Sequence, residues 1–192
     1  MKAHENLPPA IERVAVPGGS LVASVARDGA FTDHADAFRA RVDPRRFPDV
    51  DALARAFLEQ RPPAWVAAAM RARDAVVGTL FGLKTSAGVP PGHRANFAGD
   101  ATTSSAPVAL VPGMRRGIFR VLDRTTNEIL LGEDDTHLDF RVSLLHERAA
   151  DDAFITVSTV VRFHNVLGRA YFFPVRPVHA RVVPAMMRRA LA

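Results

Sequence analysis

The fold is decided by the stretch His137-Leu138-Asp139-Phe140-Arg141-Val142-Ser143-Leu144, in which every second residue is apolar. A two-residue period is typical of a β-strand with one buried face and one exposed face. The period continues to Glu147, and a second alternating segment runs from Ala153 to Phe163. We therefore predict two long strands of an antiparallel sheet, with one apolar face that another element has to cover.

The C-terminal segment supplies a candidate cover for that face. The residues from Pro177 to Leu191 are amphipathic and rich in arginine, and they predict a helix about 22 Å long at about 1.5 Å per residue. The strand from Thr136 to Glu147 would measure about 40 Å, so the sheet has to twist and curve. A curved sheet with a helix across its concave face often encloses a ligand cavity.

The remaining sequence predicts the element order strand, helix, helix, several antiparallel strands, long helix, which is an α+β fold. A weakly alternating first strand would place Asp36, Phe38, Ala40 and Val42 on one face. The expected ranges are a strand at Asp33–Val42, helices at Asp49–Gln60 and Ala64–Leu83, and strands at Gly117–Leu122 and Glu128–Leu131.

The chain divides into an N-terminal arm and one domain that contains a long loop. Residues 1–30 are expected to form an irregular N-terminal arm with a turn at Pro17-Gly18-Gly19, and residues 31–192 a single domain. A long loop rich in Gly, Pro, Ser and Thr is expected at about residues 84–114. Loops of this length are either functional lids or disordered, and the sequence leaves both alternatives open.

Composition limits the classes of function. With 192 residues, a single hydrophobic core is the default. The absence of cysteine excludes disulfides, thiolate metal sites and cysteine nucleophiles, and it makes a cytoplasmic location the simplest interpretation. The segment Met1–Pro17 does not resemble a signal peptide, and no run of about 18 apolar residues occurs, so we expect no membrane partner.

The net charge of +5 raises the question of nucleic-acid binding, because clustered cations displace counterions from phosphates. The distribution of the charge argues against it. Lys2 and Lys84 are the only lysines, and the arginines are scattered without a run longer than two. A solvated basic surface is the simpler interpretation. The preference for arginine over lysine, together with abundant alanine, is typical of a GC-rich bacterial genome.

No sequence motif names a reaction. A serine nucleophile elbow, a His-x-x-x-His metal spacing and a glycine-rich phosphate loop are all missing. We therefore expect no cofactor and no bound metal. His137 and Asp139 stand beside each other on the polar face of the first long strand, where a carboxylate could orient a general base. The alternation places that face toward solvent, which favours a cross-strand charge ladder instead.

Several runs resemble a bacterial family known as domain of unknown function 2867. These runs are Pro63–Val66, Phe81–Thr85, Leu131–Phe140 and Val160–Tyr171. The resemblance extends over most of the chain, from about Val16. The order of elements also resembles the helix-grip fold of the START-like (SRPBCC) superfamily, which includes lipid-transfer domains, plant pollen allergens and aromatase or cyclase proteins. The resemblance implies a curved antiparallel sheet wrapped around a long C-terminal helix, with two helices after the first strand, and no established activity.

Six residues are candidates for a ligand site between the sheet and the C-terminal helix. They are Tyr171, Arg176 and His179 near or on the helix, and Thr159, Phe140 and Val157 on the strands. The polar helix residues could contact a carboxylate of a ligand or act as acid and base. The alternative is a hydrogen-bonded histidine at the border of the core and a capping arginine. The hydroxyl of Thr159 needs a hydrogen-bond partner on an otherwise apolar face.

Three functions remain open from the sequence. The first is binding of a small, largely apolar or amphipathic molecule in a cavity between sheet and helix. The second is an enzyme of cyclase, dehydratase or hydrolase type, which requires Tyr171, Arg176 and His179 to converge on one point. The third is an interaction protein whose interior is filled by its own side chains. Fold analogy does not decide among them, because one scaffold serves many functions.

Overall fold

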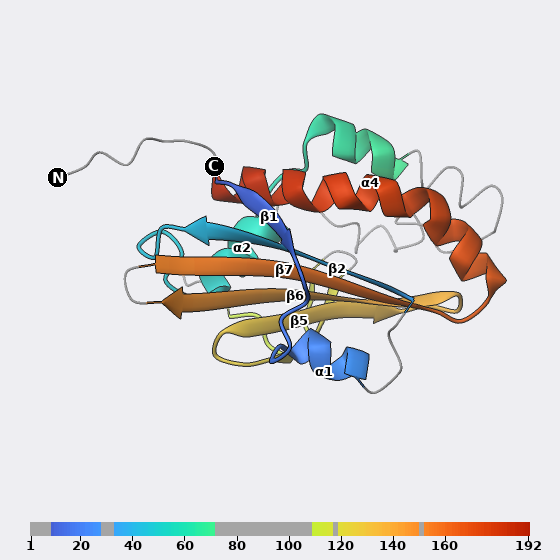
Figure 1. Cartoon of the computed structure of the whole chain (residues 1–192), viewed down its shortest axis with the longest axis horizontal. Coiled ribbons are helices and arrows are strands. Elements are labelled where there is room, and N and C mark those ends of the chain that lie inside the picture. The colour runs from blue at the N-terminus through green and yellow to red at the C-terminus, as the bar shows by residue number, and fades with distance from the viewer. Residues whose placement is uncertain (1–8, 28–32, 72–108, 117–118, 150–151) are drawn as a thin grey trace.

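Figure 1 shows one antiparallel sheet with a long helix across one of its faces. The computed structural model describes residues 9–27, 33–71, 109–116, 119–149 and 152–192. Within these ranges seven strands pair antiparallel in the order β1-β2-β7-β6-β5-β4-β3, which confirms the α+β class. The strands are β1 (Ile11–Val14), β2 (His34–Val42), β3 (Arg115–Arg116), β4 (Phe119–Arg124), β5 (Glu128–Asp134), β6 (Leu138–Ala149) and β7 (Asp152–Phe163).

The two longest strands are those that the alternation predicted. β6 and β7 are each 12 residues long, and they pair along their whole length. Their predicted inward face is confirmed, because its residues lie in the main hydrophobic core. Core members from these strands are Val142, Leu144, Ile155 and Val157.

Two helices cover this inward face. They are α2 (Val50–Glu59) and α4 (Val166–Leu191), which contribute Leu53, Phe57, Val183 and Met187 to the same core. The helix predicted at Asp49–Gln60 is therefore confirmed as α2. Asp49 is its N-cap, since its side chain accepts a hydrogen bond from Ala52 N at 2.8 Å.

The C-terminal helix begins at Val166, well before the predicted start near Pro177. Asn165 caps it by accepting a hydrogen bond from Gly168 N at 3.0 Å. The predicted start was wrong because Pro174 and Pro177 lie inside the helix, as Pro184 does further along. Each proline removes an intrahelical hydrogen bond and favours a bend, and Figure 1 shows α4 bending in its N-terminal half. Pro184 lies on the buried face of the helix, whereas Pro174 and Pro177 are exposed.

The N-terminal segment is not the irregular arm that was expected. β1 pairs with β2, with Val14 opposite Ala37. Helix α1 (Leu21–Arg27) lies on the sheet face opposite α4, as Figure 1 shows. Val22 of α1 packs with Leu130 and Val160 in a second apolar cluster. Both elements are too short to show a clear period in the sequence. β1 is held by its pairing with β2, and α1 by the burial of Val22 and Ala23.

Two predictions fall largely outside the described residues. Residues 64–71 are helical, in agreement with the predicted helix Ala64–Leu83, and the rest of that helix is not described. Of the predicted loop at 84–114, only residues 109–114 are described. In the part of the chain that the structure does describe, no helix is long and apolar enough to cross a membrane.

Candidate functional site

Three titratable side chains link β2 to α4. His34 and Asp36 stand two residues apart on β2, so both project from the sheet face that α4 covers. Asp36 Oδ2 accepts hydrogen bonds from His34 Nε2 at 3.3 Å and from His179 Nδ1 of α4 at 3.1 Å. We refer to these residues as the His–Asp–His cluster. Because an ionised carboxylate only accepts hydrogen bonds, both ring nitrogens facing Asp36 carry a proton.

Burial and hydrogen bonding shift the pKa of the Asp36 carboxyl group in opposite directions. Only 4% of the residue is exposed, and this desolvation, the largest influence, raises the pKa of its carboxyl group. The hydrogen bonds from His179 and His34, with the charge of both imidazoles, together outweigh desolvation. The pKa of Asp36 therefore lies well below its usual value of 3.8, and a charged carboxylate is buried at neutral pH.

The second carboxylate oxygen of Asp36 has a different environment. Asp36 Oδ1 is buried and accepts no hydrogen bond from the described residues. Phe172 of α4 covers one side of the cluster, with its ring centroid 4.8 Å from that of His34. The side chain of His179 keeps 20% of its surface exposed. The cluster thus contains a buried carboxylate with one oxygen that no described residue hydrogen-bonds, and His179 is its most exposed member.

The structure brings two of the six predicted site residues to this cluster. His179 hydrogen-bonds to Asp36 directly. Thr159 is buried and is the cross-strand partner of Asp36 in the pairing of β2 with β7. A ligand role for His179 and Thr159 remains a prediction.

The other four predicted residues lie elsewhere. Val157 is fully buried in the main core, and Phe140 packs against that core. Tyr171 is half-buried on α4, whereas Arg176 is exposed. As for His179 and Thr159, a ligand role for these four side chains remains a prediction.

Sequence reasoning missed His34 and Asp36 as site residues. A signal was present, because Asp36 shares its strand face with Phe38 and Ala40, both of which belong to the core. A charged residue at an inward position needs a partner, since burying an unpaired charge is costly. The partner could not be identified from the sequence, because His179 lies 143 residues away.

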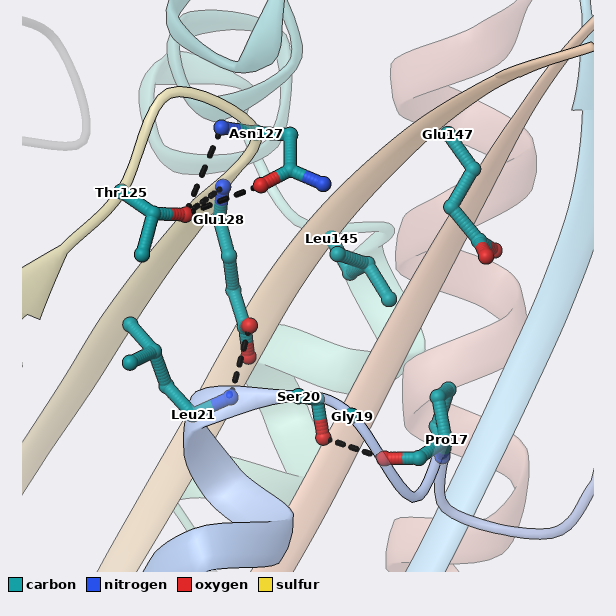
Figure 2. Close-up of a pocket in the computed structure, with 9 residues that line it drawn as sticks. All are labelled: Pro17, Gly19, Ser20, Leu21, Thr125, Asn127, Glu128, Leu145 and Glu147. Carbon is teal, nitrogen blue, oxygen red and sulfur yellow. Dashed lines mark hydrogen bonds between the residues drawn. The ribbon is translucent and has the colours of Figure 1, made fainter.

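A pocket of about 270 Å³ opens on the other face of the sheet, beside the start of α1. Figure 2 shows its lining, which comes from the segment before α1, the β4–β5 turn and β6. The lining residues are Pro17, Gly19, Ser20, Leu21, Thr125, Asn127, Glu128, Leu145 and Glu147. No basic side chain is among them.

Glu128 is the buried polar residue of this pocket, with 3% of its surface exposed. Its Oε2 accepts a hydrogen bond from Leu21 N at 2.7 Å, and its Oε1 accepts one from Ser143 Oγ at 2.5 Å. The carboxylate thus joins α1 to β6. Leu145 lies between the carboxylates of Glu128 and Glu147 in Figure 2. The arrangement agrees with the register, which pairs Leu145 with Glu128.

Two buried hydroxyl groups lie on β7, opposite β6 residues near the pocket. Thr156 is the cross-strand partner of Leu145, and Ser158 is the partner of Ser143. The oxygens of Thr156 and Ser158 are both buried and have no hydrogen-bond partner among the described residues. Buried hydroxyls are normally satisfied by protein, water or a ligand. Neither hydroxyl belongs to the residues that line the pocket.

The polar face of β6 was expected to be solvated, and this expectation was wrong for part of the strand. Ser143 is fully buried and Asp139 is 8% exposed. Ser143 donates a hydrogen bond to Glu128, which also binds Leu21 N of α1, so α1 covers this part of the face that sequence reasoning had left open to solvent. Asp139 Oδ2 lies 2.8 Å from His164 Nε2, just before α4. This hydrogen bond is part of the contact between β6 and the start of α4.

The fold and its two sites define an α+β protein with a seven-stranded antiparallel sheet, a C-terminal helix and polar groups buried on both sheet faces. The chain matches the family described as protein of unknown function (DUF2867) over residues 30–186, and it belongs to this family. No curated protein and no solved structure matches the chain. The family assignment confirms the resemblance that the motifs indicated, and it names no activity.

Proposed function

We propose that this protein binds a small amphipathic molecule with an amine or guanidinium group in the pocket beside α1. The observation that carries the proposal is the buried carboxylate of Glu128 in the wall of a 270 Å³ pocket. This volume is just below the range typical of sites for drug-sized ligands, so a metabolite-sized molecule fits. Pro17, Leu21 and Leu145 offer it apolar surface, as Figure 2 shows.

The charges of the pocket favour a cationic group. Glu128 accepts one hydrogen bond at each oxygen, and each carboxylate oxygen can accept a second. Glu147, at the other side of Leu145, pairs with Arg39 at 3.3 Å across a half-exposed contact. A charged donor between the two carboxylates would form charge-assisted hydrogen bonds, which are stronger than neutral ones.

This location differs from the space between sheet and α4 that the fold analogy suggested. In the structure, apolar side chains of β6, β7, α2 and α4 meet there in one continuous core. The enzyme alternative also receives less support, because Arg176 is exposed while His179 contacts Asp36. The long C-terminal helix across an antiparallel sheet supports our inference of a helix-grip, START-like fold. We thus retain a ligand-binding role on this fold and move the ligand to the opposite face.

The test begins with native mass spectrometry of the purified protein, compared with its denatured mass, to detect a molecule that co-purifies. A panel of small amines and guanidinium compounds, with matched neutral analogues, is then screened by thermal shift. We expect cationic amphipathic compounds to raise the melting temperature and the neutral analogues to leave it unchanged, because ligand binding stabilises the native state.

Two variants locate the binding. Leu145→Trp fills the pocket, and Glu128→Gln removes its buried charge while keeping the size of the side chain. Both should abolish the thermal shift, whereas Glu12→Gln on exposed β1 should retain it. The proposal fails if Leu145→Trp binds the same compounds as the wild type, or if no cationic compound is bound.

A further inference from the structure

We propose that His34, Asp36 and His179 form a binding site for one divalent transition-metal ion of the zinc type. This inference is independent of the proposed ligand pocket, because the cluster lies on the α4 side of the sheet and the pocket on the α1 side. Neither motif spacing nor the family assignment points to a metal. The three ligands meet only through the tertiary fold.

The chemistry of the donor set is the first argument. Imidazole nitrogens suit zinc, copper, iron and nickel, while magnesium and calcium prefer oxygen ligands alone. Two histidines and one carboxylate are a ligand set found at catalytic zinc sites, where a fourth position is left for water or substrate. His34, Asp36 and His179 supply this set with one ligand atom each.

The distances are the second argument. Asp36 Oδ2 lies 3.3 Å from His34 Nε2 and 3.1 Å from His179 Nδ1. Ligands bound tetrahedrally at about 2.0–2.1 Å from zinc lie roughly 3.3 Å apart. The three ligand atoms all lie within 4.8 Å of one another. Small rotations of the two imidazoles would therefore suffice to place a metal ion among the three atoms.

The state of Asp36 is the third argument. Its carboxyl group is buried, with 4% of the residue exposed, and Oδ1 has no hydrogen-bond partner among the described residues. Buried polar atoms are normally satisfied by protein, water or a ligand. A metal ion would replace the two ring protons that face Asp36, because histidine coordinates a metal through a deprotonated nitrogen. The free oxygen is available as an additional ligand.

The proposed site connects two elements of the fold, β2 and α4. His34 and Asp36 belong to β2, whereas His179 belongs to the middle of α4. A shared ion would fasten the helix to the sheet. His179 is the ligand that reaches the surface, with one fifth of its side chain exposed. Metal binding should thus raise the stability of the folded chain, because the unfolded chain does not bring the three ligands together.

The test uses the full chain with its affinity tag removed, after chelation and dialysis. Zn²⁺ is titrated by calorimetry, and Co²⁺ is followed by its visible absorption. We expect one ion per chain and a higher melting temperature with Zn²⁺. Asp36→Asn and His179→Ala should each weaken binding by at least about tenfold, since even changes to outer-sphere partners of metal sites cost about 10–100-fold in affinity.

His164→Ala is the matched control. Its histidine also pairs with an aspartate, Asp139, at 2.8 Å, yet it lies outside the cluster. This variant should bind Zn²⁺ like the wild type. Asp36→Asn keeps the size of the side chain, and its metal-free melting curve establishes that it is folded before titration. Binding that is absent from the wild type, or that survives unchanged in both cluster variants, would overturn the proposal.

Discussion

Gly168 in the first turn of α4 lies so close to the carbonyl oxygen of His137 that a β-carbon at this position would collide with it. His137 immediately precedes β6, so this contact fixes where the helix leaves the sheet. Asn165 reinforces the same junction by capping the helix through Gly168 N. Gly168 and Asn165 both lie in Val160–Tyr171, one of the runs that resemble the family.

Replacing Gly168 with alanine should therefore destabilise the protein. The obstacle is backbone rather than a flexible side chain, so relief requires a shift of the helix. We expect a loss of about 1–3 kcal/mol in the free energy of unfolding, as for other overpacked sites, measured by urea denaturation. Gly18→Ala is the control, because a β-carbon there meets nothing within 4 Å. Equal stability of the two variants would contradict this account.

The low pKa of Asp36 predicts an acid-dependent contribution to stability. Because the pKa is lower in the folded state than in the unfolded state, the contribution is fully present above the usual value of 3.8 and is lost as the pH falls below it. Metal-free wild type should be more stable than metal-free Asp36→Asn at neutral pH. Melting temperatures across a pH series should show this difference narrowing under acid conditions. A gap that is independent of pH would argue against an ionised Asp36 facing His34 and His179.

Glu128 should stabilise the docking of α1 on the sheet. Glu128→Ala leaves Leu21 N and Ser143 Oγ without their acceptor, and such unsatisfied groups cost about 1–3 kcal/mol when buried. Hydrogen exchange should then become faster in α1 than in β6. Glu128→Gln should show a smaller effect, because its amide oxygen still accepts a hydrogen bond. Unchanged exchange in α1 of the alanine variant would exclude this anchoring role.

Met187 tests the packing of α4 against the sheet. Its side chain is fully buried in the main core, so Met187→Ala should lose about 2–5 kcal/mol of unfolding free energy. Val178→Ala on the same helix should change stability much less, because Val178 is 38% exposed. Chemical denaturation of both variants measures the contrast. Similar losses at the two positions would mean that α4 does not pack as described.

The sequence predicted secondary structure well where apolar and polar residues alternate regularly over a long segment. β6 and β7 were predicted within two residues at either end, because burial of one strand face requires alternation. The prediction failed for β1 and α1, which are too short to carry a period. It also misplaced the start of α4, where three prolines concealed the helix.

The candidate sites were less accessible to sequence reasoning than the fold. His179 was selected because it borders the buried stripe of the helix, and Thr159 because a hydroxyl interrupts an apolar face. Glu128 and Asp36 were not selected, since their burial depends on elements distant in the chain. α1 covers the face that holds Glu128, and α4 covers the face that holds Asp36.

The sequence by itself determined the α+β class, the paired long strands, the family and the inward faces of the strands, because these follow from local periodicity and motif content. Only the tertiary structure decided which polar groups meet. Asp36 joins His34 and His179, and Glu128 joins Leu21 and Ser143. The physical reason is that a buried charge must be paired, while the sequence does not reveal which distant side chain supplies the pair.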